Sequence, residues 1–173
     1  MLNQMQATSG DEITLRPENP GDREFLFRVY ASTRQAEMAL VPWTLEQKEA
    51  FIEMQFEAQS RDYQQRFKAA DFQIVLVNGE AAGRLYLDRR ANEIRIVDIT
   101  LLPEWRGRGI GSHLLGDVLA EGERRGWPVS IHVEGSNPAL TLYERLGFQK
   151  ISAYGIYLLM VWKPNREEAC SIN

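Results

Sequence analysis

The sequence predicts an α/β protein with a single mixed, mostly antiparallel sheet and helices on both faces. Three observations predict it. The chain has 173 residues, of which 44% are hydrophobic and 25% charged, a balance that supports one domain with a sizeable core. Its apolar residues change between helical spacing and strand alternation several times. A strand, a helix and another strand follow one another within 93–133, which indicates a parallel crossover in an otherwise antiparallel sheet.

The first part of the chain is predicted to be one strand followed by helices. Ile13–Arg16 is a short strand that ends at Pro17, and Asp22 then stands at the N-cap position ahead of apolar residues at helical spacing. After a break at Pro42, Thr44-Leu-Glu-Gln47 matches a capping box and opens an amphipathic helix whose apolar pattern reaches Phe56. We expect this helical part to cover a sheet.

The rest of the chain is predicted to supply most of the sheet. An apolar, β-branched run at 72–77 is followed by Asn78-Gly79, the strongest short hairpin signal, and by alternation at 83–88. A third strand at 93–102 completes a meander. A helical stripe then runs from Ile110 to Gly126. The expected elements after it are a strand, a helix and two strands, at 128–133, 137–147, 148–152 and 156–162.

Charge and residue counts exclude several classes of function. The net charge is −4 at pH 7, so we expect no broad basic face for nucleic acid. One cysteine and two histidines are too few for an internal disulfide or a zinc cage, and we expect a reduced, cytoplasmic protein without a metal. No segment approaches the roughly 18 consecutive apolar residues that span a bilayer, so no membrane partner is expected.

The expected domain covers residues 12–162. The flanking segments, 1–11 and 163–173, are polar and without a period, which is typical of flexible tails. Cys170 lies in the second tail, so we do not expect it to act as a nucleophile.

The sharpest motif is a glycine-rich loop between a strand and a helix, Leu101-Leu-Pro-Glu-Trp-Arg-Gly-Arg-Gly-Ile-Gly111. A helix start leaves backbone N–H groups without partners, and glycines let a phosphate approach that backbone. Arg106 and Arg108 add positive charge. The loop lacks the lysine and the spacing of a Walker A motif, and a dinucleotide fingerprint that starts at Gly107 finds Ser112 at its third glycine. An anion site of another type is therefore predicted.

The loop matches [RQ]-x-x-G-x-[GA] as Arg106-Gly-Arg-Gly109-Ile-Gly111. A second motif, Asn137-Pro-Ala-Leu-Thr-Leu-Tyr-Glu-Arg-Leu-Gly-Phe148, follows after one helix and one strand. Together the two motifs resemble the signatures of the GNAT acetyltransferase superfamily. The resemblance covers roughly residues 13–162 and implies a GNAT-like acyl-CoA N-acyltransferase fold, with acetyl-CoA as the acyl donor.

The resemblance also implies the residues that bind the cofactor. Backbone groups near Ile99 and Leu101 are expected to pair with the pantetheine arm, and the Leu101 N–H to donate to the thioester carbonyl. Asn137 is expected to contact the cofactor, and it is equally suited to cap its own helix. Tyr143 is expected near the sulfur, as general acid for the departing thiolate. The implied set is Ile99, Thr100, Leu101, Arg106, Gly107, Arg108, Gly109, Ile110, Gly111, Ser112, Asn137 and Tyr143.

No glutamate stands at the two positions where members of the superfamily often place the general base. Those positions hold Arg95 and His132. His132 is the better chemical base, because imidazole titrates near neutral pH. Asp98 is the second choice, since it stands inside an apolar strand where a carboxylate is costly unless it is satisfied. Both side chains also fit a purely structural role.

We therefore expect an acetyl-CoA-dependent N-acetyltransferase that moves the acetyl group directly to a primary amine. The alternative is a non-catalytic acyl-CoA-binding sensor or scaffold, and transfer of a longer acyl group is a further possibility. The sequence identifies neither the acceptor, a small-molecule or peptide amine, nor the choice between monomer and homodimer. The candidates for the acceptor site are Glu37, Trp43 and Tyr86.

Overall fold

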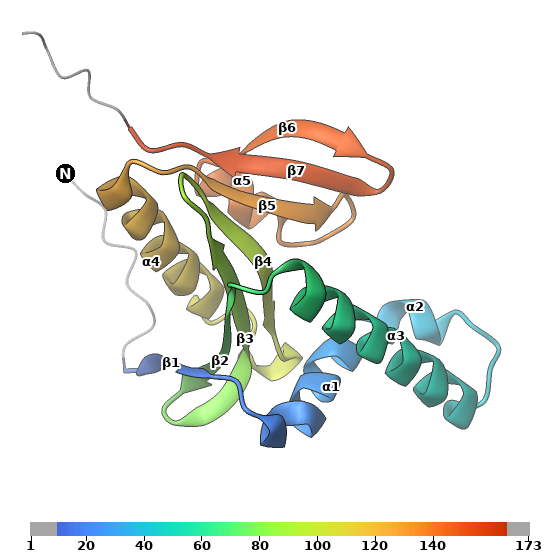
Figure 1. Cartoon of the computed structure of the whole chain (residues 1–173). Coiled ribbons are helices and arrows are strands. Elements are labelled where there is room, and N and C mark those ends of the chain that lie inside the picture. The colour runs from blue at the N-terminus through green and yellow to red at the C-terminus, as the bar shows by residue number, and fades with distance from the viewer. Residues whose placement is uncertain (1–9, 166–173) are drawn as a thin grey trace, which may run out of the picture. The chain divides into compact units, whose positions relative to one another are not determined.

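The computed structural model describes residues 10–165 (Figure 1). The chain divides into two units. The first is formed by Met1–Tyr86 with Asp98–Arg108, and the second by Leu87–Val97 with Gly109–Asn173.

Large parts of the two predicted tails, 1–9 and 166–173, lie outside the described residues, and so does Cys170. No helix within residues 10–165 has the length and apolar character needed to cross a membrane.

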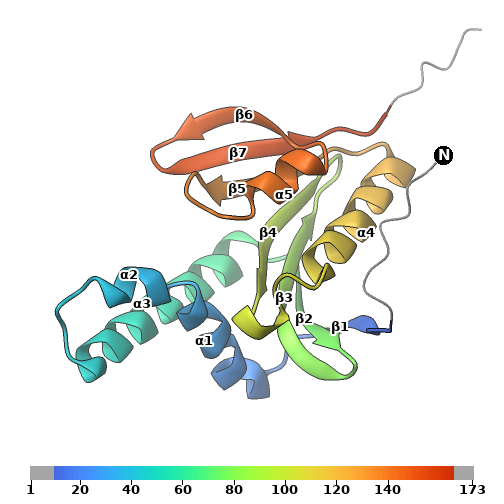
Figure 2. The same cartoon turned by 180° about the vertical axis from the view of Figure 1, so that it is seen from behind.

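Seven strands form one sheet (Figures 1 and 2). They are β1 (Ile13–Pro17), β2 (Asp71–Val77), β3 (Glu80–Arg89), β4 (Ile94–Leu101), β5 (Val129–Glu134), β6 (Gln149–Tyr154) and β7 (Tyr157–Trp162). Their order in the sheet is β1-β2-β3-β4-β5-β7-β6. β1 and β2 are antiparallel, as are β5 and β7 and β6 and β7, whereas β4 and β5 are parallel. The predicted mixed, mostly antiparallel sheet is confirmed.

The first unit contains η1 (Pro20–Asp22), α1 (Arg23–Ser32), α2 (Gln35–Ala39) and α3 (Leu45–Arg66). The predicted capping box opens α3: the Gln47 N–H donates to Thr44 Oγ1 at 3.2 Å, and the Thr44 N–H donates to Gln47 Oε1 at 3.0 Å. Phe56 packs α3 against α1, its ring centroid 5.7 Å from that of Phe27 and 5.9 Å from that of Tyr30. α3 continues ten residues beyond the predicted apolar pattern, and α2 was not predicted.

Asp22 stands at the N-cap position of α1, as predicted, but its carboxylate forms no cap hydrogen bond. It accepts instead two hydrogen bonds from the Arg16 guanidinium, at 2.6 and 2.7 Å, and one from the Asn19 N–H at 2.9 Å. The hydrogen bonds from Arg16 hold the pKa of Asp22 below its ordinary value. The side chain thus ties β1 to the start of α1.

The hairpin predicted at Asn78-Gly79 joins β2 to β3. The φ angles of these residues are 52° and 81°, the positive values that a type I′ turn needs at both central positions. The first unit has its core on these strands, where Ile74, Val75 and Leu85 are fully buried.

The second unit contains α4 (Ile110–Arg125) and α5 (Leu140–Arg145). α4 ends at Arg125, one residue before the predicted end, and Gly126 is its C-cap with a φ of 66°. α5 is shorter than the predicted helix at 137–147, because residues 138 and 139 form a turn before it. The apolar face of α4, including Leu114, Leu115 and Val118, is buried.

Candidate functional site

The loop between β4 and α4 contains η2 (Pro103–Trp105) and then the glycine-rich segment. Gly107 and Gly109 have φ angles of 71° and 80°, which L side chains rarely adopt. A Cβ atom at either position would meet no atom within 4 Å. The backbone conformation therefore requires these glycines, and the space beside them is open.

The main-chain N–H groups of this segment have no partner within residues 10–165. α4 begins at Ile110, and its N-cap, Gly109, supplies no capping side chain. No described backbone carbonyl or side chain accepts from the N–H groups of residues 107–112. Unpaired N–H groups at a helix start carry partial positive charge and bind anions. The loop thus fits the pyrophosphate that the resemblance implies.

The two arginines of the loop contact the protein itself, within the first unit. Arg106 donates from Nε to the Leu101 carbonyl at 2.8 Å and from Nη2 to Ser32 Oγ at 3.3 Å. Arg108 forms an ion pair with Asp11 at 2.7 Å, and its guanidinium carbon lies 4.7 Å from the centroid of the Trp105 ring. Both arginines therefore fix the position of the loop through these contacts. They also give the loop the positive charge that the sequence predicts.

β4 contains Ile99, Thr100 and Leu101, whose backbone is expected to contact the acyl donor. The parallel pairing of β4 with β5 covers three positions and ends at Ile96. Gly83 of β3 lies so close to β4 that a Cβ atom there would be 2.2 Å from the Thr100 carbonyl oxygen and 2.9 Å from Leu101 Cα. The missing side chain at Gly83 therefore decides how closely β3 approaches β4 at these residues.

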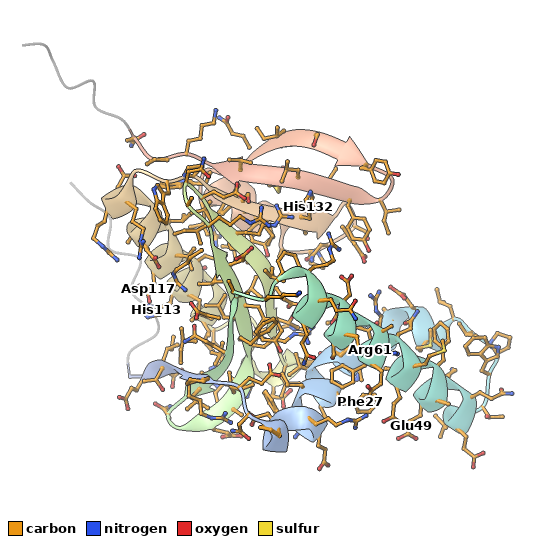
Figure 3. All side chains as sticks on the ribbon, viewed as in Figure 1. Phe27, Glu49, Arg61, His113, Asp117 and His132 are labelled. Atoms are coloured by element: carbon orange, nitrogen blue, oxygen red, sulfur yellow. The ribbon has the colours of Figure 1, made fainter. Side chains whose placement is uncertain are left out.

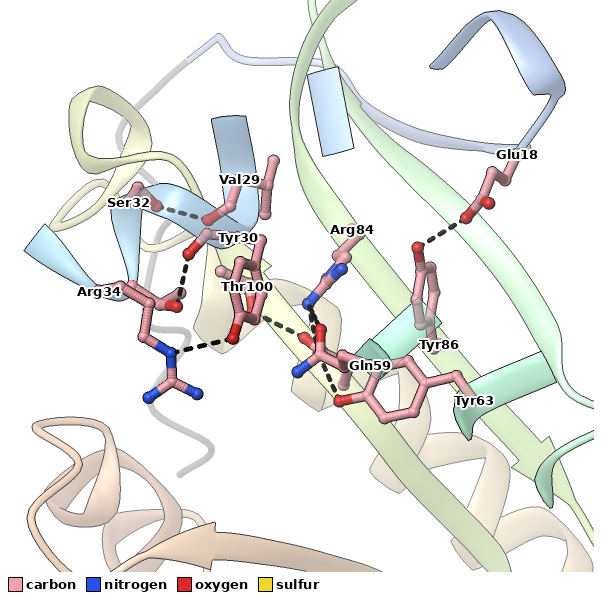
Figure 4. A network of polar contacts seen from close by, with 12 residues as sticks. Glu18, Val29, Tyr30, Ser32, Arg34, Gln59, Tyr63, Arg84, Tyr86 and Thr100 are labelled. Atoms are coloured by element: carbon pink, nitrogen blue, oxygen red, sulfur yellow. Dashed lines mark hydrogen bonds and ion pairs between the residues drawn. The ribbon is translucent and has the colours of Figure 1, made fainter. Parts of the chain in front are cut away.

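Asp98 accepts hydrogen bonds from three side chains of the first unit, those of Tyr63, Arg84 and Thr100, which Figure 4 labels. Its Oδ2 accepts from Arg84 Nη2 at 2.8 Å and from the Tyr63 hydroxyl at 2.9 Å, and its Oδ1 accepts from Thr100 Oγ1 at 2.6 Å. Arg84 also donates to Gln59 Oε1 at 2.9 Å. Both carboxylate oxygens of Asp98 are therefore engaged by protein donors.

Burial governs the electrostatics of this network. The side chains of Arg84 and Asp98 are only 4% and 11% exposed. Burial by itself lowers the pKa of Arg84, but the charge of Asp98 and the interactions with Tyr86 and Tyr63 together outweigh it, and the pKa lies above its ordinary value. Burial and then the charge of Asp98 raise the pKa of Tyr63. Tyr63 thus stays protonated and remains a hydrogen-bond donor.

The three acceptor-site candidates lie in different parts of the first unit. Tyr86 of β3 is buried, and its hydroxyl donates to Glu18 Oε2 at 2.6 Å. Glu37 of α2 forms an ion pair with Arg34 at 3.1 Å. Trp43, between α2 and α3, is 43% exposed.

The second unit holds the residues of the second motif. Tyr143 of α5 is buried, with its ring centroid 5.6 Å from that of Phe148 in an edge-to-face contact. Asn137 Oδ1 accepts from the Ala139 N–H at 2.8 Å. Asn137 therefore supports the turn that leads into α5, while the N-cap residue of that helix is Ala139.

His132 lies on β5 in the second unit, opposite Leu159 of β7. Its side chain is exposed (Figure 3). Arg95, at the other position expected for a base, donates to Ser130 Oγ at 3.3 Å.

The structure brings several predicted residues into direct contact in the first unit. Asp98 is hydrogen-bonded to Thr100, and Leu101 to Arg106. Sequence reasoning missed Tyr63 and Arg84 as partners of Asp98. A charged residue at position 84 inside the alternating run 83–88 was the available signal, because a charge on a buried strand needs a partner.

Two comparisons by sequence find relatives of this chain. A model of the acetyltransferase (GNAT) domain matches residues 39–156. Over 82 residues the chain is 33% identical to the cysteine-rich protein 2-binding proteins of Mus musculus and Homo sapiens. That match covers 46% of this chain but spans only 10% of the length of those proteins.

Solved structures share the fold. The PaiA N-acetyltransferase of Thermoplasma acidophilum, in complex with coenzyme A, has a TM-score of 0.67 and 20% identity, over 88% of this chain and 99% of that one. An acetyltransferase of Thermus thermophilus has a TM-score of 0.61 and 20% identity, over 87% and 96% of the two chains. Since the domain model covers more than half of the chain, and the glycine-rich loop lies within it, the chain belongs to the GNAT acetyltransferase family.

Proposed function

We propose that the protein transfers an acetyl group from acetyl-CoA directly to a primary amine. The observation that supports this most is the row of unpaired N–H groups at residues 107–112, in a chain of the GNAT family. They open a helix of 16 residues, so the helix dipole adds to their attraction for the pyrophosphate of the donor.

The backbone of β4 orients the donor in this proposal. Acetyl-CoA supplies a thioester whose carbonyl carbon is open to attack by an amine. The main-chain groups of Ile99 and Leu101 pair with the pantetheine arm, and the Leu101 N–H donates to the carbonyl oxygen as negative charge develops on it. The close approach of Gly83 to Thr100 and Leu101 supports this assignment, because it holds that backbone in one path.

The reaction forms a C–N bond and breaks the C–S bond, with one proton transfer at each end. An alkylammonium, with an ordinary pKa of about 10, loses a proton before it attacks. We assign the role of the base that accepts this proton to the exposed His132. Asp98 is less suited, because its two oxygens already accept three hydrogen bonds. The Tyr143 hydroxyl donates its proton to the departing thiolate.

Release of CoA across a panel of primary amines tests this function, with Tyr143→Phe beside the parent protein. We expect turnover of at least one amine by the parent. In Tyr143→Phe, kcat falls by roughly 100-fold or more, because a general acid contributes about that much. CoA should still raise the Tm of the variant, since the substitution removes one hydroxyl and leaves the glycine-rich loop intact. Unchanged turnover in the variant removes Tyr143 from the acid role.

A non-catalytic acyl-CoA-binding sensor or scaffold is the second candidate function. Arg95 at one expected position of the base, and the engagement of Asp98 in its network, favour it. This function predicts stabilisation by acetyl-CoA without turnover of any amine. A ligand at about 100 times its Kd adds roughly 2.7 kcal/mol to the free energy of unfolding, which a thermal shift detects. Absence of any shift with acetyl-CoA contradicts both functions.

A further inference from the structure

The first unit contains a cavity of about 200 Å³ that is lined by Tyr86, one of the acceptor-site candidates, but by no residue of the glycine-rich loop or of the second motif. An adjoining cavity of about 440 Å³ shares Glu18 and Phe56 with it and extends to Arg23 and Glu57. The two together have the size of a small-molecule site. The charged and aromatic side chains that line the smaller cavity are Glu18, Phe56, Tyr63, Phe72, Arg84 and Tyr86.

Aromatic rings form much of the wall of the smaller cavity. The Tyr86 ring lies 4.7 Å from Phe72 and 6.0 Å from Tyr63, centroid to centroid, both in edge-to-face contact. The faces of aromatic rings attract cations. The cluster already binds one cation of the protein itself: the guanidinium carbon of Arg84 lies 5.2 Å from the Tyr86 centroid and 6.0 Å from that of Tyr63.

The charges that line the cavity leave one carboxylate unbalanced. Arg84 is neutralised by Asp98, whose Oδ2 lies 2.8 Å from Arg84 Nη2. Glu18 forms no ion pair within residues 10–165. The smaller cavity and its buried ion pair therefore have a net charge of −1, and the excess negative charge lies on Glu18.

Glu18 is held in a defined position. Its N–H donates to the Phe72 carbonyl at 3.0 Å, and its Oε2 accepts from the Tyr86 hydroxyl at 2.6 Å. Burial raises the pKa of Tyr86, so its hydroxyl stays protonated and remains a donor. Among the described residues, none donates to Oε1 of Glu18. This oxygen is available to a ligand that donates hydrogen bonds.

We infer that this cavity binds a small organic ammonium ion with an apolar substituent. The ammonium group donates to Oε1 of Glu18, and the substituent packs against Phe56, Phe72 and the tyrosine rings. The neighbouring cavity provides room for a longer chain. This inference does not depend on acetyl transfer, because no residue of the glycine-rich loop or of the second motif takes part.

Isothermal titration calorimetry without CoA tests the inference. The probes are phenethylammonium and butylammonium, each beside its neutral alcohol, 2-phenylethanol or 1-butanol. We expect at least one ammonium ion to bind at least tenfold more tightly than its alcohol, because both can donate a hydrogen bond to the carboxylate but only the cation adds the attraction of opposite charges. Glu18→Gln keeps an acceptor for Tyr86 but removes the charge, and it should abolish this preference. Glu12→Gln removes an exposed carboxylate of the same unit and is the matched control.

A second variant keeps the test decisive if Glu18→Gln does not fold. Phe72→Leu preserves an apolar wall without the ring, so it should weaken ammonium binding more than alcohol binding. Failure of both ammonium ions to bind overturns the inference, and so does equal affinity for ammonium and alcohol, or unchanged affinity in Glu18→Gln.

An amine that accepts the acetyl group and an amine that only regulates the protein would make the same contacts in this cavity. A second experiment distinguishes the two. Acetyl-CoA is added to the protein saturated with the bound amine. If the amine is acetylated and Glu18→Gln raises its KM, the cavity holds the acceptor. Binding without product identifies the amine as an effector. Both results support the site, which is established by calorimetry whether or not acetyl transfer occurs.

Discussion

Each unit contains an ion pair between an arginine and a carboxylate, and the two pairs differ in their exposure to water. In the first unit, Arg84 and Asp98 are 4% and 11% exposed. In the second, Arg89 and Glu121 are 30% and 14% exposed, with Nε and Nη2 of Arg89 each 2.8 Å from a carboxylate oxygen, and Arg125 adds a contact at 2.9 Å. The hydrogen bonds from Arg89 hold the pKa of Glu121 below its ordinary value.

The difference lies in how the two pairs are solvated. Water can reach the partly exposed Arg89, whereas Arg84 depends on protein partners for its hydrogen bonds. Those partners are Asp98 and Gln59, and the Nε of Arg84 is a buried nitrogen without a partner among residues 10–165. A pair that depends on protein partners is therefore more sensitive to substitution than a pair that water can reach.

The largest expected effect is that of Arg84→Ala. It leaves the carboxylate of Asp98 buried without its cation, which costs about 3–5 kcal/mol of unfolding free energy. The matched change in the second unit, Arg89→Ala, lowers the free energy of unfolding by about 1 kcal/mol, because water and Arg125 still interact with the carboxylate of Glu121. Urea unfolding of both variants measures the two costs. Equal costs mean that burial does not separate the pairs.

Glycine substitutions provide the second contrast. Gly83→Ala places a Cβ atom 2.2 Å from the Thr100 carbonyl oxygen, so β4 has to shift. We expect a loss of about 1–3 kcal/mol in stability, together with weaker stabilisation by acetyl-CoA. Gly116→Ala in α4 of the second unit meets no atom within 4 Å and should add about 0.5–1 kcal/mol, because alanine favours a helix. Thermal unfolding with and without acetyl-CoA tests both, and a stable Gly83→Ala that responds normally to acetyl-CoA refutes the role given to Gly83.

The smallest effect is a pH dependence. Arg16 holds the pKa of Asp22 in the first unit below its ordinary value, as Arg89 does for Glu121 in the second. Each carboxylate therefore adds stability above its ordinary pKa of about 4, and this stability is lost as the pH falls through the lowered value. Asp22→Asn and Glu121→Gln should each lower Tm at pH 7, by an amount that shrinks below about pH 4. A pH-independent deficit shows that packing, not charge, is responsible.

Local features of this protein were predictable from neighbouring residues. The capping box of Thr44 and Gln47, the turn at Asn78-Gly79 and the loop that precedes Ile110 each depend on hydrogen bonds or φ angles within a few residues. The parallel step from β4 to β5 followed from the same kind of signal, because a helix between two strands is typical of a parallel crossover. The place of β7 between β5 and β6 was not predicted.

Contacts between distant residues were decided by tertiary structure alone. Asp98 meets Tyr63 and Arg84 across 35 and 14 positions of the chain, and Arg108 meets Asp11 across 97. Residue types indicate only that a buried charge needs a partner. The packing of helices and strands decides which partner a buried charge meets, because it fixes the distances between side chains and excludes water. The same packing decides which carboxylate, such as that of Glu18, keeps an oxygen available to a ligand.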